Sequence, residues 1–251
     1  MSHRLARALF SIVLGTLMVV SCTHKEVNTE SPDALFAEAE EAYNDEKYLI
    51  AIERYRDIKN RFPYSNRAVD AELRIADSFF EQESYIEAES AYEIFKELHP
   101  THAKSDYVQY RIGLSLNMQI PSNPTRDLTA AQRSIDAFEV MIEKFPSSTL
   151  TPKARELIFE ARKKMAEHEH YVADFYFRRR HYLSSTYRYS ALLQEFPNMG
   201  YDEEALFRLG KSYANVKMID NAKDTLKRFV SRFPNSSYRT EAETLLKEMT
   251  N

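Results

Sequence analysis

Phe62-Pro63-Tyr64-Ser65 returns along this chain as Phe145-Pro146-Ser147-Ser148, Phe196-Pro197-Asn198 and Phe233-Pro234-Asn235-Ser236, with a degenerate copy at Leu98-His99-Pro100-Thr101. Successive prolines in these copies lie 37, 46, 51 and 37 residues apart. Each copy follows one apolar-periodic run and precedes the next. Proline cannot continue the helix that it follows, because it lacks an N–H group and clashes with the preceding turn. A recurrence in this range indicates stacked helix pairs.

Residues of the same character return at fixed distances before each proline. One position is tyrosine in three repeats, at Tyr48, Tyr85 and Tyr182. Two positions are small, one on the second helix at Ala51, Ala88, Ser134, Ser185 and Ala222, and one on the first helix at Ala39, Ala76, Ala173 and Gly210. A fourth position is large, at Tyr55, Tyr92, Phe138, Tyr189 and Leu226. Small residues let two helices approach closely, and the large residues fill the space beside them. The pattern resembles the tetratricopeptide repeat. This resemblance implies an all-α protein, a right-handed α-solenoid of five tetratricopeptide-like helix pairs with a C-terminal capping helix.

The helices of each repeat follow from apolar periodicity and from the residues that begin and end it. We expect helices from about Pro32, with Ser31 as its cap, and over 48–61, 67–82, 85–98, 104–120, 128–145, 151–177, two within 201–233, and a cap over 237–249. An insertion at Gln119–Asp127 lengthens the third repeat. The fourth contains one helix of about 28 residues, or two helices with a break near Glu167-His168. The chain then divides into N-terminal repeats 33–150 and C-terminal repeats 151–251.

The first residues are typical of a bacterial lipoprotein. Arg4 and Arg7 precede an apolar run that is short for a membrane span, and Val19-Val20-Ser21-Cys22 resembles a lipobox. We expect a signal peptide over 1–21, lipid on Cys22 and a polar tether over 22–32; the alternative is an ordinary secretory signal with an incidental cysteine. Cys22 is the only cysteine, so no intramolecular disulfide can form. Thr23, rather than Asp, follows the cysteine, which in the bacterial lipoproteins that this segment resembles implies sorting to the inner leaflet of the outer membrane.

Composition argues against several classes of function. Removal of residues 1–21 changes the formal net charge from −4 to −6, which disfavours nucleic acid as a partner. His168 and His170 are two residues apart, a spacing that places them on different helix faces, so no metal site is expected. The sequence contains no glycine-rich phosphate loop and no catalytic constellation. We therefore expect a protein that is not an enzyme and has no cofactor other than the lipid on Cys22.

Two stretches carry a more specific resemblance. They are Pro100-Thr101-His102 with Asp106-Tyr107-Val108, Tyr110 and Gly113-Leu114, and Ala166-Glu167-His168-Glu169 running into Asp174-Phe175-Tyr176 and Arg178-Arg179-Arg180. With the lipobox and five repeats, the chain resembles the competence lipoproteins, a family of the outer-membrane β-barrel assembly machinery. The resemblance covers essentially the whole chain. It departs at Gln119–Asp127, where many members carry a longer aromatic and acidic insertion.

This resemblance implies a non-catalytic scaffold, lipid-anchored on the periplasmic face of the outer membrane. Its implied partners are the last POTRA domain of BamA, other lipoproteins of the complex and unfolded outer-membrane proteins. Candidate substrate-peptide residues in repeats one to three are Tyr64, Arg67, Arg74, Tyr107, Tyr110 and Arg111. Candidate BamA-docking residues are Arg178, Arg179, Arg180 and Arg188. Two alternatives need no binding partner: the tyrosines Tyr107 and Tyr110 pack between adjacent repeats, and the docking arginines lie on a solvated face. Two other functions stay open, a repeat lipoprotein that coordinates cell-wall synthesis or division and an accessory or sugar-binding protein.

Overall fold

The computed structural model describes residues 31–250. The signal region, Cys22 and the tether up to residue 30 lie outside the described residues. Within the described part all regular structure is helical and forms five pairs and a final helix. The pairs are α2 (Pro32–Asn44) with α3 (Tyr48–Arg61), α4 (Asn66–Glu81) with α5 (Tyr85–Leu98), α6 (Ser105–Met118) with α7 (Thr129–Lys144), α8 (Thr151–Arg178) with α9 (Tyr182–Glu195), and α10 (Asp202–Asn215) with α11 (Ile219–Arg232), followed by α12 (Arg239–Glu248).

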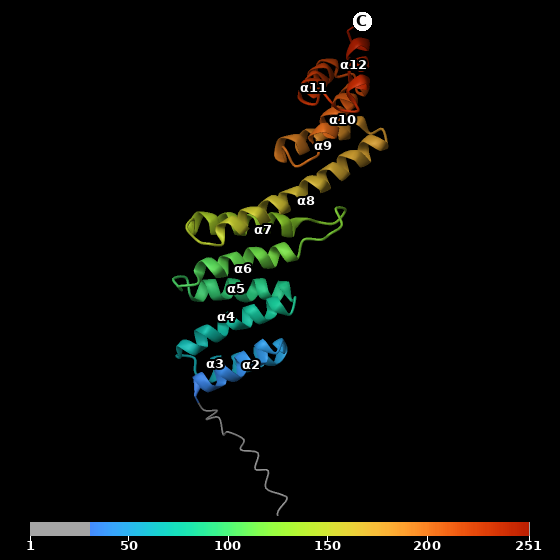
Figure 1. Cartoon of the computed structure of the whole chain (residues 1–251). Coiled ribbons are helices and arrows are strands. Elements are labelled where there is room, and N and C mark those ends of the chain that lie inside the picture. Colours follow the sequence, from blue (N-terminus) through green and yellow to red (C-terminus); the bar gives the residue numbers. More distant parts are fainter. Residues whose placement is uncertain (1–30, 251) are drawn as a thin grey trace, which may run out of the picture.

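The helices stack in chain order into an elongated solenoid with α2 at one end and α12 at the other (Figure 1). Each helix packs mainly on the one before it and the one after it. This arrangement confirms the predicted solenoid of helix pairs and the predicted bounds of the helices to within about two residues. At the N-terminal end, the Ser31 hydroxyl accepts a hydrogen bond from the Ala34 amide, with Pro32 in the first turn, as the sequence indicated.

The turn inside four of the five repeats has one geometry. A residue with positive φ lies two positions after the last residue of the first helix, at Glu46, Glu83, Arg180 and Lys217. The amide that follows it donates back to a carbonyl in the last turn, as Lys47 does to Ala42 and His181 to Tyr176. This is the Schellman motif, in which the position with positive φ is usually glycine. The third repeat lacks it, because the insertion replaces its turn.

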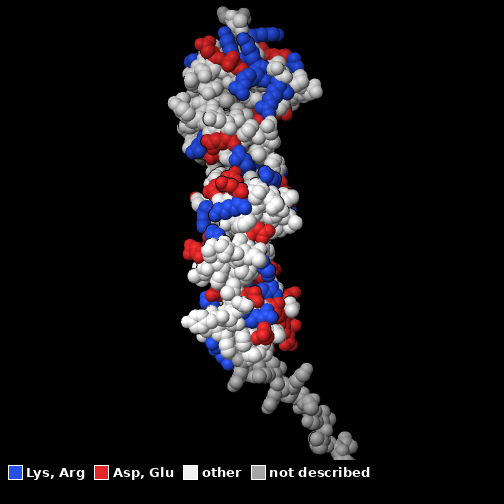
Figure 2. Space-filling view, turned by 90° about the vertical axis from the view of Figure 1, so that its left-hand side faces the viewer, with Lys and Arg blue, Asp and Glu red and all other residues white. Residues whose placement is uncertain are grey.

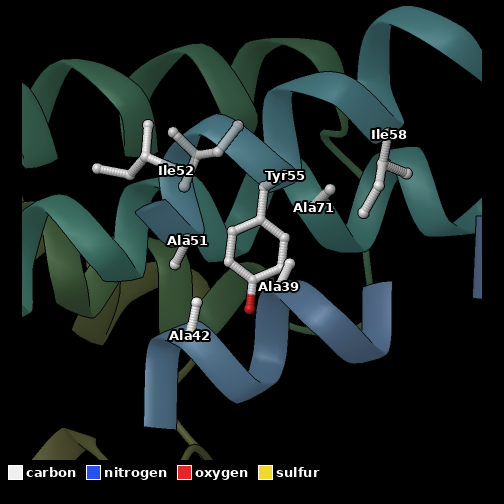
Figure 3. Close-up of a cluster of buried hydrophobic side chains, with 8 residues drawn as sticks. Ala39, Ala42, Ala51, Ile52, Tyr55, Ile58 and Ala71 are labelled. Carbon is white, nitrogen blue, oxygen red and sulfur yellow. The ribbon is translucent and has the colours of Figure 1, made fainter. Parts of the chain in front are cut away.

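The recurring positions form the core between the helices. All members of the small and the large second-helix positions are buried, including Ala51, Ser134, Tyr55 and Phe138, whereas the recurring tyrosines at the start of these helices are only partly buried. In the first repeat, Tyr55 lies between α2 and α4, with Ala39, Ala42 and Ala71 around it (Figure 3). A Cβ atom on Gly113 would lie 2.7 Å from the ring of Phe138, so this glycine occupies the small first-helix position of the third repeat. The repeat phase is therefore confirmed, and Gly113 extends it.

Helix α8 joins the N-terminal repeats of the stack to the C-terminal repeats. It is one helix of 28 residues, so the predicted alternative of a break near residues 167–168 is wrong. Ala154 and Ala161 pack against α7, whereas Ala166 and Ala173 pack against α9 and α10. A helix of this length spans about 42 Å, enough to serve both groups of repeats. The insertion loop reaches it (Figure 1), because the Nδ1 atom of His168 contacts the carbonyl oxygen of Pro124.

Candidate functional site

Three seams between neighbouring repeats hold the same cluster of three polar side chains. An acidic residue on the first helix of one repeat meets a tyrosine on the second helix, and an arginine comes from the first helix of the next repeat. We call this arrangement the seam cluster; its members are Glu40, Tyr55 and Arg74, then Asp77, Tyr92 and Arg111, then Asp174, Tyr189 and Arg208. The tyrosine follows the acid by 15 residues and the arginine follows it by 34 in every case.

The first seam cluster ties α2 to α3 and α4. The hydroxyl of Tyr55 donates to Glu40, and Nε of Arg74 donates to the same carboxylate at 2.6 Å, with a second bond from Nη2. Arg74 also lies over the ring of Tyr43, 4.1 Å from its centroid. Burial alone would raise the pKa of Glu40, but its bonds to Arg74 and Tyr55 lower that pKa below its usual value. The carboxylate is therefore held ionised beside the arginine.

The second seam cluster is centred on Asp77. Its Oδ1 atom accepts hydrogen bonds from the hydroxyls of Tyr92 at 2.6 Å and Tyr107 at 2.8 Å. Nε of Arg111 donates to the Tyr92 hydroxyl at 2.8 Å, while Arg74 from the first cluster lies 3.5 Å from the other Asp77 oxygen. Burial and the Asp77 carboxylate raise the pKa of both tyrosines above the usual range. The two clusters therefore form one continuous polar network across repeats one to three.

The last seam cluster lies between α8 and α10. Arg208 contacts the carboxylates of Asp174 and Glu204 and donates to the Tyr189 hydroxyl at 3.5 Å. Beside it, Nε2 of His170 lies 3.0 Å from Glu204, and the imidazole stacks on Tyr201. Burial lowers the pKa of His170, and the Glu204 carboxylate only partly offsets this effect. The histidine is a member of this network and lies away from His168.

The seam between the third and fourth repeats has no such cluster. The positions that correspond to the acid, tyrosine and arginine are Leu114, Phe138 and Tyr171. Phe138 is buried and Tyr171 is 40% exposed on α8. Sequence reasoning identified the tyrosine position as packing and did not recognise the paired acid and arginine. The constant spacings of 15 and 34 residues were the signal that could have found them.

Three of the six candidate peptide residues belong to this network. Arg74, Tyr107 and Arg111 come together around Asp77. Arg67 bonds Asp33 at 2.6 Å and Asp70 at 3.2 Å, at the end of the stack.

Two candidate tyrosines lie apart from the Asp77 network. Tyr110 packs on Phe138, and Tyr64 is fully exposed in the turn after α3. Thus the structure joins three of the six residues and gives most of them a partner within the stack.

The candidate docking residues lie at the corner between α8 and α9. Arg178 is 66% exposed and bonds Asp174 at 2.5 Å, while Arg179 lies over the ring of Phe175 at 4.3 Å. Arg180 has the positive φ of the turn. Arg188, on α9, bonds Glu169 at 3.3 Å and is 46% exposed. Cations at the carboxyl end of a long helix interact favourably with its dipole, which gives this basic corner a local physical cause.

Two further observations limit the chemistry of residues 31–250. No group of three or more His, Cys, Asp or Glu side chains in this part of the chain is arranged to hold a metal ion. None of the helices described combines the length and the apolar character that crossing a membrane requires.

The chain is similar to a family of outer membrane lipoproteins and to several outer membrane protein assembly factors. Residues 28–227 match the family YfiO, described as an outer membrane lipoprotein. The chain is 27% identical to outer membrane protein assembly factor BamD of Neisseria meningitidis serogroup A, covering 94% of both chains. It is 28% identical to BamD of Neisseria gonorrhoeae over 84% of this chain and 83% of that one. BamD of Rickettsia prowazekii is 27% identical over 99% of this chain and 100% of that one.

Solved structures that align with the chain include two of tetratricopeptide proteins. The TPR2AB domain of yeast Sti1 aligns with a TM-score of 0.42 and 15% identity, covering 88% of this chain and 98% of that one. The P58(IPK) TPR domain aligns with a TM-score of 0.44 and 15% identity, covering 89% of this chain and 58% of that one.

Proposed function

The chain belongs to the YfiO family of outer membrane lipoproteins, and from this premise we propose that it is a non-catalytic scaffold of the outer-membrane β-barrel assembly machinery. In this proposal the C-terminal repeats dock on the last POTRA domain of BamA. The N-terminal repeats receive unfolded outer-membrane proteins, and other lipoproteins of the complex bind the remaining surface. The lipid on Cys22 holds the protein at the periplasmic face of the outer membrane.

One observation supports the C-terminal docking surface more than any other. The basic corner carries four arginines, and none of them is fully buried in the stack. An arginine that is half exposed and already oriented by one carboxylate can donate hydrogen bonds to a second carboxylate from a partner, with little further loss of side-chain freedom. Arg188 meets this description, because Glu169 orients it while 46% of its side chain is in contact with solvent. It is therefore the residue on which we test the proposal.

The N-terminal repeats suit the receipt of a flexible chain for a different reason. Their seam clusters fix the first helices of repeats one to three relative to one another, so the surface is preorganised before a ligand binds. Exposed aromatic and aliphatic side chains border this region, with Tyr64 fully exposed and Leu49 and Ile86 about two-thirds exposed. Such side chains contact an unfolded apolar segment at little entropic cost, since the backbone beneath them is rigid.

The test is binding of purified BamA periplasmic domains to wild-type protein and to Arg188→Glu. If Arg188 pairs with a carboxylate buried at the interface, the reversal should cost about 2–5 kcal/mol of binding free energy. At an exposed rim it should cost less than about 1 kcal/mol. Lys164→Glu is the matched control, because Lys164 is exposed on α8 and makes no ion pair within the described chain. Equal binding by the two folded variants would remove Arg188 from the docking surface.

A further inference from the structure

A groove runs along the C-terminal repeats between α9 and α11. Its volume is about 650 Å³, within the range of sites that bind ligands. Leu209 and Tyr213 of α10 form its floor together with Leu193 of α9. The Ser190 hydroxyl lies 3.3 Å from that of Tyr213, so one polar bond crosses the floor. The groove is separate from the basic corner, because the Arg188 side chain extends toward Glu169 on α8.

The α11 wall of this groove carries cations that have no acidic partner. Lys223, Lys227 and Arg228 line the groove, and none makes an ion pair or side-chain hydrogen bond within residues 31–250. Elsewhere on α10 and α11 such groups are paired, as Lys211 is with Glu241 and Arg232 with Asp202. Figure 2 shows Lys and Arg gathered over this end of the stack. Cations left unpaired in an acidic protein are available to carboxylates from outside.

The groove is not uniformly basic. Asp220 and Asp224 also line it, two turns and one turn, respectively, before the pair Lys227 and Arg228. Positive charge therefore concentrates toward the carboxyl end of α11. On the opposite wall, Tyr187 is 70% exposed and precedes Ser190 and Gln194 by three and seven residues, a spacing that places all three on one stripe of α9. An exposed aromatic side chain thus continues the wall beyond the groove.

We propose that the groove between α9 and α11 binds an acidic amphipathic helix of a partner protein. The apolar stripe of such a helix would cover Leu193, Leu209 and Tyr187. Its carboxylates would pair with Lys227 and Arg228, one turn beyond Asp224 on α11. A channel between two helices with an apolar floor is the shape into which the ridge of a third helix packs.

The position of the groove favours a protein partner over a lipid headgroup. Helix α2, which follows the predicted lipid anchor in the sequence, lies at the opposite end of the elongated stack from α11 (Figure 1). A headgroup would also make no use of the apolar floor or of Tyr187. Charge and shape together therefore select a segment that has both carboxylates and large apolar side chains.

The test measures fluorescence anisotropy of a labelled 14-residue peptide with leucine at helical spacing and glutamate elsewhere, added to the acylated protein in detergent. Lys227→Glu/Arg228→Glu should weaken binding by about tenfold or more, because two charge-assisted contacts become repulsive. Lys163→Glu/Lys164→Glu on α8 carries the same change of charge and should leave binding unchanged. Tyr187→Ser should weaken it about threefold or more through loss of the aromatic contact.

Four results would overturn the proposal. The first is no saturable binding of the glutamate peptide by wild-type protein. The second is equal loss in the two double variants, which would indicate an effect of net charge alone. The third is equally tight binding of a peptide with lysine in place of glutamate. The fourth is displacement of the glutamate peptide by micelles that contain phosphatidylglycerol. Far-ultraviolet circular dichroism of each variant confirms that it is folded.

Discussion

Replacing Arg74 by methionine should destabilise the N-terminal repeats far more than the loss of an ordinary surface arginine. Arg74 lies on α4 and forms a bidentate ion pair with the Glu40 carboxylate on α2. It also lies over Tyr43 and approaches Asp77. Methionine keeps most of the apolar stem that packs in the seam, so the substitution mainly removes the charge and its hydrogen bonds.

The magnitude follows from how exposed the pair is. Breaking a buried pair by removing one partner costs about 3–5 kcal/mol, whereas an exposed pair contributes about 0–1 kcal/mol. Arg74 and Glu40 are 25% and 27% exposed, nearer the buried limit. Contact of Arg74 with the Tyr43 ring adds about 0.5–1 kcal/mol. Solvent screening reduces the contribution of the Arg74–Glu40 pair, because both side chains are partly exposed. We therefore expect a loss of about 2–3 kcal/mol.

The assay is urea unfolding followed by circular dichroism, with Arg61→Met as control. Arg61 pairs with Asp57, and both side chains are almost half exposed, so the control should lose less than about 1 kcal/mol. If Arg74 acts through Glu40, the double variant Glu40→Gln/Arg74→Met should lose less than the sum of the single losses. Equal losses for Arg74→Met and Arg61→Met, or strict additivity with Glu40→Gln, would refute the reasoning.

Three further predictions concern the anchor, the packing and the pH dependence. Cys22→Ala should leave the protein unacylated and weakly held by membranes, because its only lipid anchor is removed; wild-type incorporation of radiolabelled fatty acid would contradict this. Ala88→Leu should lower the free energy of unfolding by about 1–3 kcal/mol, since Ala88 is fully buried between helices, and an unchanged urea midpoint would contradict the assigned repeat phase. Burial lowers the pKa of His170 in the folded state below its ordinary value of 6.5. The unfolded chain therefore binds more protons at this histidine than the folded chain does, and the free energy of unfolding should fall as the pH decreases from about 7 to 5. His170→Gln should reduce that fall, and an identical pH profile of urea midpoints would contradict the assignment.

Much of the fold could be predicted because tetratricopeptide packing is local. The prolines after each second helix mark the repeats. The residues that share the positions of Ala51 and Tyr55 are buried in every repeat. The length of α8 was also predictable, since no proline or glycine interrupts residues 153–178. The contact between Pro124 and His168 could not be predicted, because these residues are 44 positions apart and no periodic signal links the insertion loop to α8.

The candidate site was harder to predict for a physical reason. Arg74 and Arg111 were singled out as anchors for a peptide, yet Arg74 pairs with Glu40 within the stack. Arg111 donates to Tyr92 and pairs with Glu81 there. A single charge in a sequence does not reveal whether its partner lies in the same chain. The recurrence of the acid, tyrosine and arginine at three seams would have resolved this, because a repeated spacing indicates an internal contact. Arg188 and Glu169 have no such recurrence.

The most direct test of the central claim is affinity purification of the tagged, full-length protein from detergent-solubilised outer membranes. If the chain is a scaffold of the β-barrel assembly machinery, BamA should copurify in an amount comparable to the tagged protein. The yield of BamA should fall for Arg188→Glu and stay unchanged for Lys164→Glu. Recovery of cell-wall synthesis or division enzymes without BamA would contradict the account.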